Sequence, residues 1–321
     1  MTKLRCTQLA VLLLTIIIPV NIFMPYNDPP EKIITAVKQN FMERVASASM
    51  YPFKKITEDF FLSPDFFNNN RIVAYYGHPK SKIMGILGRH TKEELAGLVK
   101  KTAGKYESIN GCKGVIPAFY IIYGTCQPEG RINRINRQLI ELYIEYALAN
   151  KMLIYLDHQI GKYTPQEAIR ELIPFLKYPN VHLALDPEWR TTKPMKVIGS
   201  ISGKEINEVQ QIIQDYLTSN NIPGKRQLVF HQFHAKMIRN REDVNSTYRQ
   251  IIPVHTTSGW GRPEAKQGTH IRNSAAVNIP YKGFKLWYYY SSQQGVHYDR
   301  PLMAPEEVLA LNPQPGLIIY Q

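Results

Sequence analysis

Residues 152–157 read MLIYLD, residues 181–186 read VHLALD, and a stretch of helical character separates them. Each is a short apolar run that ends in an aspartate, which is typical of a buried parallel strand and the loop that follows it. Between them, Thr164 and Pro165 followed by Glu167 form a helix-start signal. This strand–helix–strand unit predicts a parallel sheet covered by helices.

The same alternation repeats along the chain. The predicted strands cover residues 71–76, 114–123, 152–157, 181–186, 227–231, 250–255, 284–289 and 317–320. Capping boxes predict helix starts at Thr91 and Ser202, and further helices are expected over 134–149 and 305–311. Eight strands over about 250 residues predict an α/β protein with a TIM-type (β/α)8 barrel. A doubly wound open sheet is the competing fold, and residues 256–283 show no clear element.

The N-terminal part has a different character. Lys3 and Arg5 precede an apolar run over residues 9–24, which is the pattern of an export signal or a membrane anchor. We therefore expect residues 1–24 to be a signal or anchor segment, 25–70 a linker with a helix over 31–50, and 71–321 the barrel domain. The helix over 31–50 is a candidate to cover the gap left after the last strand. The predicted location is extracellular, periplasmic, or membrane-attached through residues 9–24 and facing outward.

Charge and cysteine content add two expectations. The formal net charge of +13 favours anionic surfaces, but no basic run is concentrated enough to predict a nucleic-acid partner. Cys112 and Cys126 flank the strand predicted over 114–123, which at about 3.3 Å per residue is far longer than the roughly 7 Å that a disulfide spans. We therefore expect these two cysteines to remain unpaired.

The chemistry is expected at the C-terminal ends of the strands, where barrels of this kind hold their active sites. Alternation along the fourth predicted strand directs Asp186, and beyond it Glu188, into the barrel mouth. Asp157 ends the neighbouring strand, roughly 5 Å away in the pairing direction. Clustered carboxyls cannot all ionise, so one is expected to stay protonated and act as an acid, as glycoside cleavage requires. We predict Glu188 as general acid, with Asp186 or Asp157 stabilising the oxocarbenium-like transition state.

Aromatic and polar side chains at the other strand ends suit a sugar, because rings offer flat apolar platforms with polar edges. The predicted substrate-binding residues are Tyr76, His78, Gln159, Trp189, His231, Gln232, His255, Trp260 and Trp287. The expected partner is a polysaccharide or other glycan, with no cofactor and no metal. A simpler alternative is that Asp186 and Glu188 only shape the loop, with Glu188 paired to Arg190.

Two other functions remain open at this point. One is a barrel that binds a glycan without cutting it. The other is a metal-dependent hydrolase, because His78, His158, His231 and His255 all lie at predicted strand ends and imidazoles with Asp157 can hold a divalent metal. The chain contains no HxxxH or HxH pair.

Four short motifs carry a resemblance to known proteins. They are 185–189 (LDPEW), 157–161 (DHQIG), 231–233 (HQF) and 318–321 (IIYQ). Together they resemble a poorly characterised family of secreted bacterial barrel proteins over residues 71–321, which implies the barrel and export. The D-x-E triplet is also similar to that of family-18 chitinases and family-25 muramidases. That resemblance implies that Glu188 is the proton donor and that Asp186 assists the acetamido group of the substrate. The run of aspartates that precedes the chitinase motif, and the muramidase aspartate of the first strand, are missing here.

Overall fold

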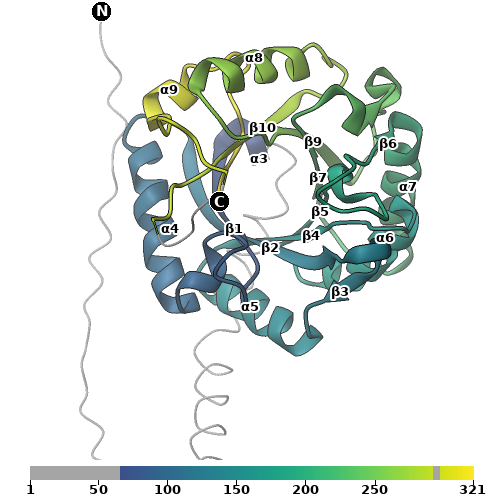
Figure 1. Cartoon of the computed structure of the whole chain (residues 1–321). Coiled ribbons are helices and arrows are strands. Elements are labelled where there is room, and N and C mark those ends of the chain that lie inside the picture. Colours follow the sequence, from purple (N-terminus) through teal and green to yellow (C-terminus); the bar gives the residue numbers. More distant parts are fainter. Residues whose placement is uncertain (1–65, 292–296) are drawn as a thin grey trace, which may run out of the picture. The chain divides into compact units, whose positions relative to one another are not determined.

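The computed structural model describes residues 66–291 and 297–321, which contain a closed ring of parallel strands with helices outside it (Figure 1). The ring is closed because β1 pairs in parallel with both β2 and β11. Its strands, in spatial order, are β1 (Asn70–Gly77), β2 (Gly114–Cys126), β4 (Leu153–His158), β5 (Val181–Leu185), β7 (Arg226–Gln232), β9 (Ile251–Thr257), β10 (Tyr281–Leu286) and β11 (Leu317–Tyr320). The predicted (β/α)8 barrel is confirmed, and the open sheet is ruled out.

All eight predicted strands are present, and one of them is displaced. β10 was expected over 284–289, but it begins at Tyr281, where pairing with Val254 of β9 starts, and it ends at Leu286. Lys282 interrupts the apolar run and made the first half of this strand hard to recognise, whereas Lys285 lay within the predicted strand. Both lysine side chains are buried, Lys285 inside the barrel and Lys282 on the shell side, where it donates to the carbonyl of Ala276, so the strand is less apolar than its neighbours.

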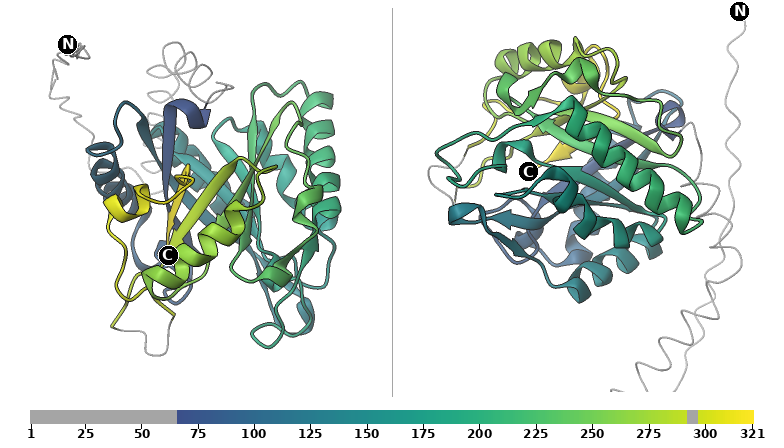
Figure 2. Two further views of the ribbon diagram at one scale, coloured as in Figure 1. Left: turned by 90° about the horizontal axis from the view of Figure 1, so that it is seen from above. Right: turned by 90° about the vertical axis from the view of Figure 1, so that its right-hand side faces the viewer.

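The helices pack around the barrel (Figure 2). They are α3 (Phe66–Asn69), α4 (Lys92–Glu107), α5 (Arg137–Ala149), α6 (Pro165–Leu172), α7 (Gly203–Ser219), α8 (Pro263–Ser274) and α9 (Pro305–Leu309). The predicted capping boxes at Thr91, Thr164 and Ser202 are confirmed. Helix α8 was not predicted, because the residues that it buries include Lys266, His270 and Asn273 and therefore give no apolar periodicity.

Short elements decorate the loops. They are β3 (Ile132–Arg134), β6 (Ile201–Ser202), β8 (Ile238–Arg239) and the 3-10 turns η1 (Leu87–Arg89), η2 (Pro128–Gly130), η3 (Ile173–Lys177), η4 (Pro187–Trp189), η5 (Ala235–Met237) and η6 (Arg241–Asp243). β3 extends the end of β2 in antiparallel pairing, and β6 pairs with β8. Of these, η4 matters most for function, because it follows the fourth strand of the barrel directly.

Two apolar clusters form the core. One fills the barrel, and the other lies in the shell between barrel and helices. In β5, Val181, Leu183 and Leu185 belong to the shell while Ala184 belongs to the interior, as the alternation predicted. Cys112 is exposed and Cys126 is buried, and they are not paired with each other, in agreement with the expectation from strand length.

The predicted signal or anchor over 1–24 and the helix over 31–50 lie outside the described residues. The described part begins with α3, and β1 follows at Asn70. Within residues 66–291 and 297–321, no helix is both long and apolar enough to cross a membrane. Export and attachment through residues 9–24 therefore stay predictions.

Candidate active site

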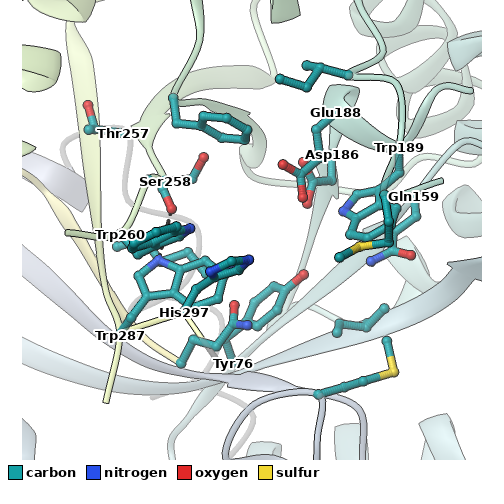
Figure 3. Close-up of a pocket in the computed structure, with 18 of the residues that line it drawn as sticks. Tyr76, Gln159, Asp186, Glu188, Trp189, Thr257, Ser258, Trp260, Trp287 and His297 are labelled. Atoms are coloured by element: carbon teal, nitrogen blue, oxygen red, sulfur yellow. Dashed lines mark hydrogen bonds between the residues drawn. The ribbon is translucent and has the colours of Figure 1, made fainter. Parts of the chain in front are cut away.

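A pocket of about 920 Å³ opens at the C-terminal ends of the barrel strands (Figure 3). Its lining includes seven of the residues that the sequence singled out: Tyr76, Gln159, Asp186, Glu188, Trp189, Trp260 and Trp287. Figure 3 shows Asp186, Glu188 and Trp189 on one side, facing Trp260, Trp287 and His297 on the other. The volume lies within the range of ligand-binding pockets.

The two carboxylates are presented by the turn after β5. Asp186 is still extended, with φ −109° and ψ 93°, and Pro187 then begins η4 with the backbone angle that a helical turn needs. The chain folds back so closely that a Cβ on Gly199 would lie 2.6 Å from the carbonyl oxygen of Pro187. The amide of Gly199 donates to the carbonyl of Glu188 at 2.7 Å, which fixes the turn. This geometry keeps Asp186 and Glu188 on the pocket wall.

The simpler alternative for these residues is wrong. The side chain of Asp186 caps no backbone N–H of η4. Arg190 does not pair with Glu188 but forms an ion pair with Glu205 at 2.6 Å. Glu205 lies in the first turn of α7, where the same carboxylate closes the capping box with Ser202. Loop shaping therefore does not account for the two acids.

Burial sets the ionisation of the carboxyl groups. It raises the pKa of Asp186 to about 6, although the charge of Lys285 opposes the rise. Burial, and after it the charge of Asp186, raises the pKa of Glu188 to about 8. The same two causes raise the pKa of Asp157 to about 8. Near neutral pH the cluster therefore holds protonated and ionised carboxyls side by side.

Hydrogen bonds organise this cluster. The side chain of Trp189 lies next to Asp186 and Glu188 and favours the ionised form of both, which lowers their pKa. The hydroxyl of Tyr76 donates to Oδ2 of Asp157 at 2.9 Å, and burial raises the pKa of Tyr76 well above its usual range, so the phenol stays a donor. His231 Nε2 lies 3.8 Å from the same oxygen, but burial lowers its pKa well below the usual value and keeps it neutral.

Asp157 lies below the pocket and does not line it. It is fully buried and stands opposite Ala184 in the register of β4 and β5, which is two residues before Asp186. Its Oδ1 has no hydrogen-bond partner within the described part of the chain. Direct contact of Asp157 with a substrate does not fit this position, and Asp157 acts on the pocket through its charge, which raises the pKa of Glu188.

Four of the predicted substrate-binding residues also lie outside the pocket lining. His231 points into the barrel and bonds to the hydroxyl of Tyr120 at 2.8 Å. His255 and Gln232 point to the shell side of their strands, where His255 bonds to Oε1 of Gln232 at 2.7 Å. His78 accepts from the backbone amide of Lys80 in the loop after β1. None of the four is part of the pocket lining. Gln159 does line it, with its Oε1 held by the amide of Cys126 at 2.8 Å.

The histidine-based metal site is not assembled either. His158 points to the shell side of β4, where Nε2 lies 3.4 Å from Glu171 on α6. His231 and His255 are engaged as described. Across residues 66–291 and 297–321, no group of three or more His, Cys, Asp or Glu side chains is arranged to hold a metal. In the described part of the chain, the predicted histidine ligands therefore do not come together into the metal site that a metal-dependent hydrolase would need.

Lys285 is the main site residue that sequence reasoning missed. Its side chain lines the pocket with Nζ 3.5 Å from the centre of the Tyr76 ring and 4.9 Å from that of Trp287. Burial lowers the pKa of Lys285, and the charges of Asp186, Asp157 and Glu188 oppose this. Alternation was an available signal, because Phe284 and Leu286 pack in the shell and so direct Lys285 inward.

The opposite wall is held together by a second missed group, Asp299. Its Oδ2 pairs with Lys266 at 2.6 Å and accepts from the amide of Trp287 at 2.9 Å. Its Oδ1 accepts from the amide of Gly261 at 3.0 Å, next to Trp260. The indole of Trp287 donates to the carbonyl of Ser258 at 2.9 Å. One buried carboxylate therefore positions the segments that carry both tryptophans.

Trp260 forms the outer part of that wall. Its ring stacks on His297 with centroids 4.3 Å apart and an interplanar angle of 7°, and half of its surface is exposed. His297 had no sequence signal, because it lies far along the chain in a long loop. The stacked pair gives the pocket a flat edge.

No protein-family model and no curated protein matches this sequence. Among solved structures, the chain is similar to a chitinase from Chromobacterium violaceum ATCC 12472, at 9% identity over 68% of this chain and 69% of that one, with a TM-score of 0.40. It is similar to a GH5 family lichenase from Caldicellulosiruptor sp. F32, at 12% identity over 84% and 86%, with a TM-score of 0.42. It is also similar to an oxaloacetate acetylhydrolase, at 12% identity over 84% and 81%, with a TM-score of 0.44. At such identities and scores, the likeness concerns the barrel alone, and the reaction has to be argued from the site.

Proposed function

We propose that this protein is a glycoside hydrolase that acts on a cell-envelope or extracellular polysaccharide. One observation carries the proposal: Asp186 and Glu188 share one pocket wall, and burial holds their pKa values apart at about 6 and about 8. Two carboxyls with separated pKa values are the acid and the charged partner that glycosidic cleavage uses.

In this mechanism Glu188 is the general acid. Its raised pKa keeps it protonated at neutral pH, so it can donate a proton to the leaving oxygen of the scissile bond. Asp186 is ionised above about pH 6 and stabilises the positive charge that develops at the anomeric carbon. The side chain of Trp189 favours the ionised form of both groups.

Asp157 and Lys285 are positioning residues in this scheme. Lys285 lowers the pKa of all three carboxyls, which keeps Asp186 ionised in a buried site. Asp157 works in the opposite direction, because its charge raises the pKa of Glu188. Tyr76 connects the two, since it donates to Asp157 while its ring lies under the Lys285 ammonium.

The aromatic wall is the proposed sugar-binding surface. Trp260 and Trp287 lie across the pocket from the carboxylates, so a ring stacked on either would place its glycosidic bond toward Glu188 (Figure 3). The D-x-E resemblance adds that Asp186 assists an acetamido group, which favours N-acetylated sugars as substrates. An exported location, carried by Lys3, Arg5 and the apolar run 9–24, would bring the protein to such polymers.

The test uses the full chain with peptidoglycan, chitin oligomers and other glycans. We expect the wild type to release reducing ends from at least one of them and Glu188→Gln to be about 10²- to 10⁴-fold slower. Glu208→Gln, an exposed acid on α7, is the matched control and should keep the wild-type rate. Equal rates for the wild type and Glu188→Gln, or no release from any glycan, would reject the proposal.

The same experiment addresses the non-catalytic alternative. A barrel that only binds a glycan would retain it on Glu188→Gln with unchanged affinity and would yield no products. The aromatic wall is compatible with both outcomes, and the separated pKa values of Asp186 and Glu188 are what favour catalysis.

A further inference from the structure

The mouth of the pocket carries exposed aliphatic side chains that sugar binding does not require. Ile83 is 70% exposed, Met195 80%, Val197 50% and Ile198 43%, and all four line the pocket. They come from two loops, one after β1 and one after η4. Large exposed apolar residues that gather at one place mark an interaction surface rather than ordinary solvent-exposed surface.

The backbone supports this reading at Met195. Its φ of 64° is in the left-handed region, which is costly for a residue other than glycine. A glycine would adopt this conformation without strain, yet the position carries a long apolar side chain that is 80% exposed. The loop therefore holds a flexible hydrophobic side chain outward.

The same two loops are basic. Lys80 and Lys82 precede Ile83, and Lys193 and Lys196 flank Met195; all four lysines are exposed. Neither residues 78–84 nor residues 191–198 contain an aspartate or glutamate. We call these four lysines and the four aliphatic residues the rim. Lysines interleaved with aliphatic side chains suit the boundary between anionic headgroups and acyl chains.

We infer that the rim docks the barrel mouth onto an anionic lipid surface. The aliphatic tips would enter the headgroup region, while the lysines would contact lipid phosphates and acidic headgroups. The formal net charge of +13 adds long-range electrostatic attraction to an anionic surface. Trp260, half exposed at the same mouth, is the residue type that is enriched at membrane interfaces.

This inference is independent of the reaction and of residues 9–24. A membrane-docked mouth would receive substrate from the lipid surface rather than from bulk solution. The rim combines lysines with aliphatic side chains, and this combination is the relevant observation. A basic rim without the aliphatic side chains would suit a soluble polyanion equally well. The aliphatic tips are what favour lipid.

The chain provides its own reporter. Its three tryptophans, Trp189, Trp260 and Trp287, all line the pocket, so tryptophan emission reports on the mouth even when another segment attaches the protein to a vesicle. The probe is a vesicle of brominated phosphatidylcholine, with or without phosphatidylglycerol. Bromine quenches tryptophan only at short range, so quenching requires the mouth to contact the bilayer.

We expect the full-length wild type to be quenched on the anionic vesicles, and about tenfold more lipid to be needed on neutral vesicles or in high salt. A rim variant combining Ile83→Ser, Met195→Ser, Val197→Ser and Ile198→Ser should lose the quenching. The matched control is Ile271→Ser with Val277→Ser, at 66% and 83% exposed positions outside the pocket, which should behave as wild type.

Because all the substituted side chains are exposed, the variants should fold with an unchanged circular-dichroism spectrum and Tm. A second variant, Lys193→Glu with Lys196→Glu, should lose the preference for anionic lipid while its aliphatic tips stay intact. Co-sedimentation with vesicles but no quenching of the wild type would overturn the inference. Equal quenching of the wild type and the rim variant would also overturn it.

Discussion

Carboxyl groups on the inner and outer sides of β4 have pKa values that are shifted in opposite directions. Inside the barrel, burial raises the pKa of Asp157, Asp186 and Glu188. Outside, next to His158, burial also raises the pKa of Glu171, but hydrogen bonds from Arg134 and His158 outweigh it and lower that pKa to about 2. Asp157 and His158 are adjacent in β4, so one step along the strand separates the two environments.

The difference is the position of the cation. Arg134 donates to both oxygens of Glu171, at 2.6 and 2.5 Å, which is the bidentate geometry that stabilises a charged carboxylate. Lys285 lies over the Tyr76 ring instead, and acts on the interior carboxyls only through its charge. The outer cluster is thus built as a structural ion pair, whereas the inner one is poised to exchange protons.

The largest expected effect comes from a comparison of two substitutions, one of an inner and one of the outer acidic residue. Asp186→Asn should lower kcat by about 10²-fold or more, because the ionised partner of Glu188 is lost. Glu171→Gln should leave kcat within about twofold, since Glu171 does not line the pocket. Steady-state kinetics would measure both, on whichever glycan the wild type is found to cleave in the test proposed above. Comparable losses would show that the two clusters are not functionally distinct.

Asp157 predicts a pH-dependent stability. Its folded pKa is raised above the unfolded value of 3.8, so its contribution is complete below pH 3.8 and is lost as pH rises through about 8. Within that window the loss is about 1.4 kcal/mol per pH unit. Asp157→Asn should therefore gain stability relative to the wild type from pH 5 to pH 7, measured by urea unfolding. A difference that stays constant with pH would contradict the raised pKa.

Glu171 predicts the opposite sign. Its folded pKa is lowered, so its contribution is present above the unfolded value of 4.5 and is lost as pH falls toward about 2. Because the pair is partly exposed, Glu171→Gln should cost only about 1 kcal/mol at pH 7. The cost should shrink at pH 3 in the same urea experiment. Glu145→Gln, an exposed acid on α5, is the control and should be neutral at both pH values.

The smallest effect is expected for Lys285→Met. Removing the ammonium raises the pKa of Asp186 and Glu188, so both limbs of the pH profile of kcat/KM should move to higher pH, by about one unit. Lys282→Met, on the same strand but bonded to the carbonyl of Ala276, should leave the profile in place. A shift to lower pH would show that Lys285 does not act on the carboxyls as a positive charge.

The barrel could be predicted because its strands are apolar runs of regular spacing and because capping boxes mark the starts of three helices. Helix α8 and the first half of β10 could not, because they bury Lys266, His270 and Lys282, which read as surface residues. A buried polar side chain leaves no apolar pattern, and the carboxylate partner of Lys266 is 33 residues away, at Asp299.

The site was predictable only in part, because the sequence does not give the level of each residue along the barrel axis. Sequence places Asp157 and Asp186 at strand ends, but the register sets Asp157 two residues lower, so one is inside and the other lines the pocket. His231 is inside the barrel for the same cause, whereas His255 points to the shell side of its strand. Lys285 lay within the predicted strand 284–289 but was not considered as a site residue, because attention went to the strand ends. Only the pairing of neighbouring strands fixes these levels.

Asp299 has a consequence for how such a protein could change its ligand. Asp299 is not itself part of the pocket lining, but its bonds to Lys266 and to the amides of Gly261 and Trp287 position the segments that carry Trp260 and Trp287. Replacing it would re-space the two rings and leave Asp186 and Glu188 untouched. If the proposed function holds, a substitution at Asp299 would alter which ligands fit between the rings without altering the proposed catalytic carboxyls.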